Sequence, residues 1–196
     1  MQLSKVKESI RKSELRAKIL LGSVQLIAVS KVQPNNKIES VLKEGHRCFG
    51  ENRVQEALGK WPGFRNSYDN IELHLIGPLQ TNKARQAFDT FNVIQPLDRV
   101  KLAKSFASLA QEKGFCPSLF IQVNTGEEPQ KAGIFPEKLD LSKKAYAELD
   151  LKIGNYIRCK FIEIIIVWIV SFILFSILGL KYSLLLSFLC GVSVII

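Results

Sequence analysis

Short apolar runs alternate with helical patterns five times between residues 25 and 149, and this alternation constrains the fold more than any other feature of the chain. Apolar runs of this kind are typical of strands that are covered on both faces. Strand–helix alternation with short connections predicts parallel β/α units. The fold class is therefore α/β, with either an open doubly wound sheet or part of a (β/α)8 barrel. The expected strands are 25–30, 47–50, 71–76, 91–95 and 118–124, and the expected helices are 3–20, 37–44, 54–60, 81–88, 99–113 and 137–149.

Local signals set several of the expected helix ends. The pair Pro62-Gly63 predicts a break just after the helix at 54–60. Thr81 is expected to cap the helix at 81–88, Asp98 to cap the helix at 99–113, and Pro136 to open the last helix. No G-x-G-x-x-G pattern follows the first strand and no P-loop pattern occurs in the sequence. A dinucleotide site or a P-loop site therefore lacks support.

Polar residues lie at or near the ends of the expected strands. Because the carboxyl ends of parallel strands meet at one edge of a sheet, functional side chains in such folds gather there. The sequence therefore predicts a binding site at that edge. The candidate residues are Lys31, Asn52, His74, Asn82 and Asn124.

Lys31 is the candidate with the most specific chemistry. It follows the apolar run Leu26–Ser30, so its stem is expected among apolar side chains with its amine at the mouth of the fold. Desolvation favours the uncharged amine, which is the form that attacks an aldehyde. The alternative is an ordinary solvated lysine in a loop.

The other four candidates each have a structural alternative. Asn52, Asn82 and Asn124 are expected to hydrogen-bond a ring substituent of a ligand, or else to cap helices. His74 lies between Leu73 and Leu75, so it serves the site or is a core histidine with its hydrogen bonds satisfied.

Charged residues are unevenly distributed along the chain. From residue 161 to residue 196 only Glu163 and Lys181 are charged, so the whole net charge of +9 lies in residues 1–160. The basic residues of that part are scattered rather than clustered with aromatic residues, which is typical of solvated helix faces. No nucleic-acid partner is therefore expected.

The uncharged end of the chain predicts a membrane segment. About 20 helical residues cross the ~30 Å core of a bilayer, and Phe161–Leu180 meets this requirement, whereas Tyr182–Ile196 is shorter. A buried core helix is the alternative. Because Lys152, Arg158 and Lys160 precede the first span, the rest of the chain is expected in the cytoplasm, anchored to membrane lipid through residues 161–196.

The cysteines do not predict a metal site. Cys48, Cys116, Cys159 and Cys190 are widely spaced, without a C-x-x-C pair, and the chain has two histidines. The first 18 residues mix charged and apolar residues at helical spacing, unlike a secretory signal. Free thiols in a reducing compartment are expected.

Four motifs in order carry a family resemblance. Over about residues 3–140 they resemble the pyridoxal-phosphate homeostasis protein family, whose single domain is similar to the N-terminal barrel of alanine racemase. The motifs are Ala28-Val-Ser-Lys31; Phe49-Gly-Glu-Asn52 with Val54-Gln-Glu-Ala57; His74-Leu-Ile-Gly77 with Leu79-Gln80 and Asn82-Lys83; and Ile121-Gln-Val-Asn124 through Lys131-Ala-Gly133-Ile134.

This resemblance implies that the chain binds pyridoxal 5′-phosphate (PLP), with Lys31 forming the internal aldimine and Asn52 beside the cofactor. Members of the family are regarded as carriers or regulators in vitamin B6 balance, so no enzymatic reaction is expected. A racemase, the enzymatic alternative, would need a second acid/base residue on the opposite face of the cofactor. The family domain has eight β/α units, of which about five are readable here. The expected fold is an incomplete (β/α)8 TIM-type barrel followed by a hydrophobic helical membrane tail, and loss of the C-terminal barrel is expected to impair PLP binding.

A second resemblance covers about residues 148–196. Lys152-Ile-Gly-Asn-Tyr-Ile-Arg158, Ile162-Glu-Ile-Ile165 and Leu178-Gly-Leu-Lys-Tyr182 through Gly191-Val-Ser-Val194 are similar to a segment of the autoinducer-2 exporter (PerM-like permease) family of multispanning membrane proteins. The expected division is a PLP-binding barrel part at 1–140, a junction with a basic membrane-proximal helix at 141–160, and a transmembrane helix with a second apolar helix at 161–196. The alternative is a hybrid without function, or a permease fragment with a soluble passenger.

Overall fold

The computed structural model describes residues 2–138 and 162–193. Five parallel strands form one sheet in chain order, β1 (Ala28–Val29), β2 (Cys48–Glu51), β3 (Glu72–Leu75), β4 (Val93–Leu97) and β5 (Ser118–Ile121). The expected α/β part is therefore confirmed. A doubly wound sheet would reverse its strand order at a switch point, whereas this order is the one found in a (β/α)8 barrel.

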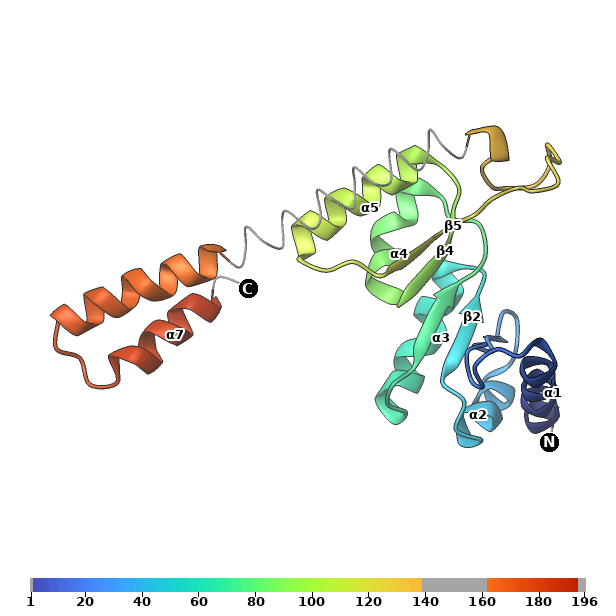
Figure 1. The fold of residues 1–196 in the computed structure, drawn as a ribbon, viewed down its shortest axis with the longest axis horizontal. Coiled ribbons are helices and arrows are strands. Elements are labelled where there is room, and N and C mark those ends of the chain that lie inside the picture. The colour runs from blue at the N-terminus through green and yellow to red at the C-terminus, as the bar shows by residue number, and fades with distance from the viewer. Residues whose placement is uncertain (1, 139–161, 194–196) are drawn as a thin grey trace.

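Helices connect the strands (Figure 1). The connecting helices are α2 (Asn35–Lys43), α3 (Val54–Ser67), α4 (Ala84–Thr90) and α5 (Val100–Lys113), whereas α1 (Gln2–Ala17) precedes β1. Short 3-10 turns lie at Thr81–Lys83 and Pro136–Lys138. The helix expected at 137–149 lies mostly outside the described residues. Near the end of the chain, residues 162–177 are helical and α7 spans Ser183–Ser193.

The hydrophobic core lies between the sheet and the helices α2 to α5. Alternate strand residues point toward the helices, and Phe49, Leu73 and Ile94 are buried there to within 1% exposure. Helix α3 contributes Trp61 and α5 contributes Phe106, both fully enclosed. Burial of side chains of this size stabilises the fold by roughly 1.5–3 kcal/mol each. On the opposite face β3 carries Glu72 and His74, beside Cys48 of β2.

Three expected helix ends are wrong because side-chain contacts override local signals. Helix α3 continues through Pro62 to Ser67, with Trp61 packed 4.9 Å from the Phe49 ring and 5.6 Å from the Phe64 ring. A proline removes one helical hydrogen bond, and the aromatic packing on both sides of Pro62 offsets that loss.

Two expected caps are used elsewhere. Neither α4 nor α5 has a side-chain hydrogen bond at its N-cap. The Thr81 hydroxyl accepts a hydrogen bond from Arg99 Nη2 at 3.3 Å, and the Asp98 carboxylate pairs with Arg99 Nη1. Arg99 therefore binds both side chains that were expected to cap helices.

The expected transmembrane tail at 161–196 is wrong. Across the described residues, the helices are each too short or too polar to cross a membrane. Membrane lipid as a partner of residues 161–196, and membrane anchoring, therefore have no support.

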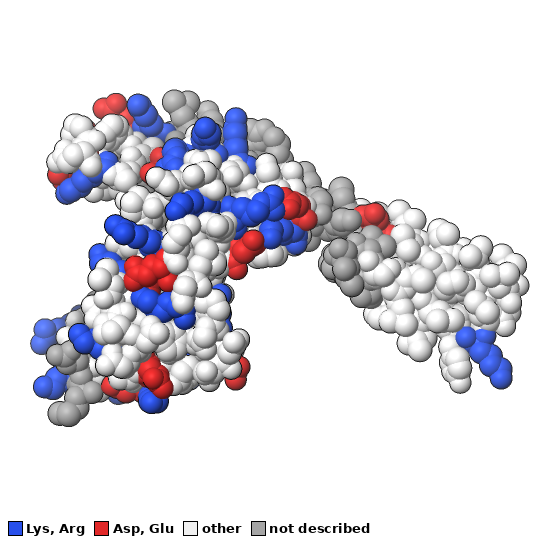
Figure 2. All heavy atoms as spheres, turned by 180° about the vertical axis from the view of Figure 1, so that it is seen from behind, with Lys and Arg blue, Asp and Glu red and all other residues white. Residues whose placement is uncertain are grey.

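A backbone turn at Gly179 ends the helix that includes residues 162–177. Gly179 has a positive φ of 67°, its N–H donates to Ser176 O, and the Leu180 N–H donates to Phe175 O. This pair of bonds is a Schellman motif, which ends a helix. Helix α7 then packs against the preceding one, since a Cβ on Gly191 would lie 3.1 Å from Trp168 Cβ. The surface over these helices is nearly free of charge, in contrast to the α/β part (Figure 2).

Candidate functional site

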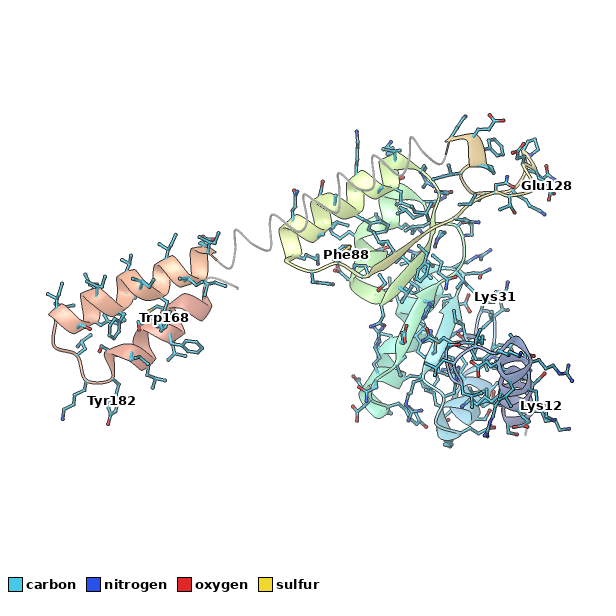
Figure 3. All side chains as sticks on the ribbon, in the orientation of Figure 1. Lys12, Lys31, Phe88, Glu128, Trp168 and Tyr182 are labelled. Carbon is cyan, nitrogen blue, oxygen red and sulfur yellow. The ribbon has the colours of Figure 1, made fainter. Side chains whose placement is uncertain are left out.

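Lys31 lies just past the carboxyl end of β1, where the sequence predicts a ligand site (Figure 3). Its side chain is exposed, so the expected apolar enclosure of its stem is not present. The exposure follows from the local backbone: β1 is two residues long, and Val32 has a positive φ of 58° that turns the chain away from the strand direction. Lys31 is therefore an accessible amine at the edge of the sheet.

The residue before Lys31 is anchored by a buried carboxylate. Glu51, at the end of β2, is fully buried, and its Oε1 accepts hydrogen bonds from Ser30 Oγ at 2.8 Å, Trp61 Nε1 at 3.1 Å and Lys60 Nζ at 3.1 Å. Its Oε2 has no hydrogen-bond partner among residues 2–138 and 162–193. We call Ser30, Glu51, Glu56, Lys60 and Trp61 the Glu51 network.

Lys60 joins this network to the loop that carries Lys31. Its Nζ also donates to Ser30 O at 3.1 Å and to Glu56 Oε1 at 2.9 Å, and Glu56 Oε1 accepts from the Val32 N–H at 2.6 Å. Burial disfavours the charged amine, but the hydrogen bonds to Glu56 and Glu51 outweigh it and raise the pKa of Lys60. The hydrogen bond from Lys60 lowers the pKa of Glu56. The backbone on both sides of Lys31 is thus held to α3.

A hollow of about 830 Å³ lies at the same edge, beside Asn52. Its lining includes the cationic side chains of Arg53, Lys83 and Arg99. Gly77 lets the next loop approach closely, because a Cβ there would lie 2.4 Å from Asn52 O. The full lining is Asn52, Arg53, Val54, Gln55, Pro78, Leu79, Gln80, Lys83 and Arg99.

Of the five residues predicted for the site, only Asn52 lines this hollow. Asn82 is exposed in the 3-10 turn. Asn124 is buried, and its Nδ2 donates to Glu128 O at 2.8 Å and Lys131 O at 3.3 Å, which holds the loop after β5. Lys31 lies outside the lining. The ligand-binding roles of these residues remain predictions.

His74 belongs to a different group, on the polar face of the sheet. Its Nε2 lies 2.9 Å from Glu72 Oε1 and 3.3 Å from Cys48 Sγ, and its Nδ1 lies 3.1 Å from Gln95 Nε2. Burial first, and then the Glu72 carboxylate, raise the pKa of the Cys48 thiol to about 11. The cysteine spacing did not predict this cluster. The pattern Glu72-x-His74 could have indicated part of it, because residues two apart on a strand lie on the same face.

Comparisons with known proteins support the resemblance over the first part of the chain. The pyridoxal phosphate homeostasis protein of Haemophilus influenzae is 39% identical over 118 residues, covering 60% of this chain and 50% of that protein. The Escherichia coli protein of that name is 35% identical over 150 residues, covering 75% and 63%, and the Aquifex aeolicus one is 36% identical over 154 residues, covering 79% and 65%. The chain thus spans 50–65% of the length of these relatives.

Solved structures agree with these relatives. PipY from Synechococcus elongatus is 40% identical, and its structures without and with PLP give TM-scores of 0.62 and 0.61. The match covers 71% of this chain and 64% or 63% of PipY.

The last part of the chain gives a different match. The sequence profile of the family described as "AI-2E family transporter" matches residues 130–196. Over 60–79% of its length the chain is therefore similar to pyridoxal phosphate homeostasis proteins, while its last third resembles the AI-2E transporter family.

Proposed function

We propose that this chain binds PLP at the carboxyl edge of its sheet, with Lys31 as the covalent attachment point, and that it serves PLP homeostasis rather than catalysis. The observation that carries the proposal is the similarity to PipY, which has been solved with PLP bound. Lys31 adds an accessible primary amine at the edge where β/α folds bind ligands.

The surroundings of Lys31 fit an aldehyde-bearing phosphate ester. A lysine amine condenses with an aldehyde: the aldehyde oxygen leaves as one water molecule with both amine protons, and a C=N bond forms. The Glu51 network holds the backbone of Ser30 and Val32, so the amine extends from a fixed base. The hollow at the same edge of the sheet, whose lining does not include Lys31, carries the Asn52 amide and the Arg53, Lys83 and Arg99 cations, which suit the polar and anionic groups of PLP.

The covalent role of Lys31 is tested by trapping. The purified chain is mixed with PLP, reduced with borohydride, digested and mapped by mass spectrometry. We expect the pyridoxyl label on Lys31, and loss of most of the label in Lys31→Arg, because a guanidinium does not condense with the aldehyde. Lys37→Arg, at an exposed lysine of α2, is the matched control and should keep the label. A label that stays at another lysine, or is absent from the unmodified chain, would overturn the proposal.

We also propose that this chain holds PLP more weakly than PipY does. The chain matches 63–64% of PipY, and the resemblance places the phosphate-binding loops of the family in the C-terminal third of the domain. A side-by-side PLP titration of both proteins, followed by absorbance, should show a dissociation constant at least tenfold higher for this chain. Equal affinities would contradict the idea.

A further inference from the structure

The cluster on the polar face of β2 and β3 brings three metal-ligand types together. Cys48 and Glu72 are paired across the strands, and His74 is two residues beyond Glu72. One ligand atom from each residue lies within 4.8 Å of the others. The two shortest separations are 3.3 Å from Cys48 Sγ to His74 Nε2 and 2.9 Å from His74 Nε2 to Glu72 Oε1.

These separations are close to those in a tetrahedral metal site. Zinc lies about 2.3 Å from sulfur and about 2.0–2.1 Å from nitrogen or oxygen, which puts neighbouring tetrahedral ligand atoms roughly 3.3–3.6 Å apart. Outward shifts of about half an ångström in these side chains would open the cluster enough to hold the ion. Cys48 and His74 are buried, whereas the Glu72 side chain is 39% exposed and free to adjust.

Two glutamines provide the outer support that such sites use. Gln95 meets His74 Nδ1 at 3.1 Å; with its amide turned by 180°, Gln95 Oε1 accepts the Nδ1–H and leaves Nε2 for a metal. Gln25 Nε2 lies 2.9 Å from Glu72 Oε2 and 3.5 Å from Cys48 Sγ. The Gln25 amide N–H thus holds the Glu72 carboxylate in place, and water fills the fourth position around the ion.

The cluster has its own access route, away from Lys31. A hollow of about 490 Å³ is lined by Gln25, Cys48 and Glu72 together with α1 residues, including Arg11 and Glu14. Cys48 and Glu72 are the first residues of β2 and β3, so this hollow lies at the amino ends of the strands. Lys31 follows the carboxyl end of β1. An ion can therefore reach the cluster without passing the proposed PLP site.

We propose that Cys48, Glu72 and His74 bind a divalent transition-metal ion of the zinc class. A set of one sulfur, one imidazole nitrogen and one carboxylate oxygen suits Zn²⁺ and its spectroscopic substitute Co²⁺. Mg²⁺ and Ca²⁺ prefer sites made of oxygen ligands, so this set does not suit them. Binding replaces the Cys48 thiol proton, which is released to solvent, while the neutral His74 ring keeps its one proton on Nδ1.

The test is a Co²⁺ titration of the full chain, freed of metal with a chelator and kept without PLP. We expect a thiolate-to-cobalt charge-transfer band that saturates at one ion per chain and disappears when Zn²⁺ is added. Cys48→Ser should abolish the band, and His74→Gln and Glu72→Gln should each weaken binding tenfold or more. Cys190→Ser is the matched control, since this cysteine lies on α7, and it should keep the band.

Folding of each variant is checked by circular dichroism, and Zn²⁺ should raise the Tm of the parent chain but not that of folded Cys48→Ser. A parent chain without the charge-transfer band would overturn the proposal, as would a band that persists in Cys48→Ser. Because PLP is absent throughout, these outcomes are independent of the Lys31 proposal.

Discussion

Lys60 is a charged side chain that is largely removed from solvent. It is 10% exposed and contacts the carboxylates of both Glu51 and Glu56, whereas Arg85 and Glu112 form their pair with more than half of each side chain in solvent. Water screens an exposed pair, but a buried carboxylate that loses its cation keeps the cost of desolvation. The two pairs should therefore differ sharply in what they contribute to stability.

Replacing Lys60 with methionine should lower the free energy of unfolding by roughly 3–5 kcal/mol, because Glu51 would remain buried without its cation. Urea denaturation followed by circular dichroism measures this change. Arg85→Met is the matched control and should leave the denaturation midpoint almost unchanged. Equal effects in the two variants would mean that the Glu51 network does not depend on its ion pair.

His46 should make the fold sensitive to mild acid. It is 7% exposed, its Nε2 has no hydrogen-bond partner among residues 2–138 and 162–193, and its ring meets Phe49 edge-on at 5.4 Å. Burial, as the largest cause, lowers the pKa of His46, so protonation favours the unfolded chain. Its contribution to stability is complete above the ordinary histidine pKa of about 6.5 and is lost as the pH falls below it.

The measurement is the pH dependence of the denaturation midpoint between pH 7.5 and 5. His46→Gln should flatten this profile, since glutamine does not titrate. An unchanged slope in His46→Gln would show that carboxylates, and not this ring, cause the loss of stability in acid.

At the scale of the elements, helix α3 contains interior residues that have low helix propensity. It contains Gly59, Pro62 and Gly63, yet it runs to Ser67 because Trp61 is fully buried against Phe49. A Cβ at Gly63 would meet nothing within 4 Å. Gly63→Ala should therefore raise the free energy of unfolding by roughly 0.5–1 kcal/mol, as alanine does in helix interiors.

The matched control for that change is Gly77→Ala. There the added Cβ would lie 2.4 Å from Asn52 O and 2.7 Å from Asn52 Cα, so the backbone must shift. We expect this variant to be destabilised while Gly63→Ala is stabilised, with both read from the midpoint of urea denaturation. A loss of stability in Gly63→Ala would indicate that α3 needs the flexible residue beside Pro62.

The elements were predictable from the sequence where a local pattern and burial agree. Each expected strand overlaps an observed one, although β2 extends past residue 50 to Glu51 and β4 past residue 95 to Leu97. The errors fall where contacts between distant residues compete with local signals, as at Pro62 beside Trp61 and at Thr81 beside Arg99. The Cys48–His74 contact was not predicted, because it depends on the pairing register of β2 and β3, and residue spacing along the chain does not reveal that register.

At the scale of the whole molecule, the sequence composition led to a wrong prediction for the last apolar run. The count of uncharged residues from 161 to 180 predicted one membrane span, but a span also needs an unbroken backbone helix. The turn at Gly179 lies near the end of this run and separates the helix that includes residues 162–177 from α7, which contacts it at Gly191. The position of Lys31 was predicted correctly as the end of the first strand, whereas its exposure depended on how short β1 is.

The five strands should also differ in stability from the middle of the sheet to its ends. β3 lies between β2 and β4, and its Leu73 and Leu75 are fully buried. β1 and β5 stand at the two ends of the described sheet, with Val29 50% and Phe120 56% exposed. Since local opening costs less where fewer apolar contacts are lost, amides of β1 and β5 should exchange with solvent deuterium well before those of β3.

Hydrogen exchange followed by mass spectrometry or NMR measures this gradient. Amides of β3 should exchange at the rate set by global unfolding, whereas those of β1 and β5 should exchange at least tenfold faster, a gap of about 1.4 kcal/mol in opening free energy. The Lys60→Met variant distinguishes exchange through global unfolding from exchange through local opening. Because this variant lowers global stability, the amides of β3 should exchange faster. The amides of β5 open locally and lie outside the Glu51 network, so their exchange rates should change little. Equal protection of β3 and β5 would show that the sheet opens as a single unit.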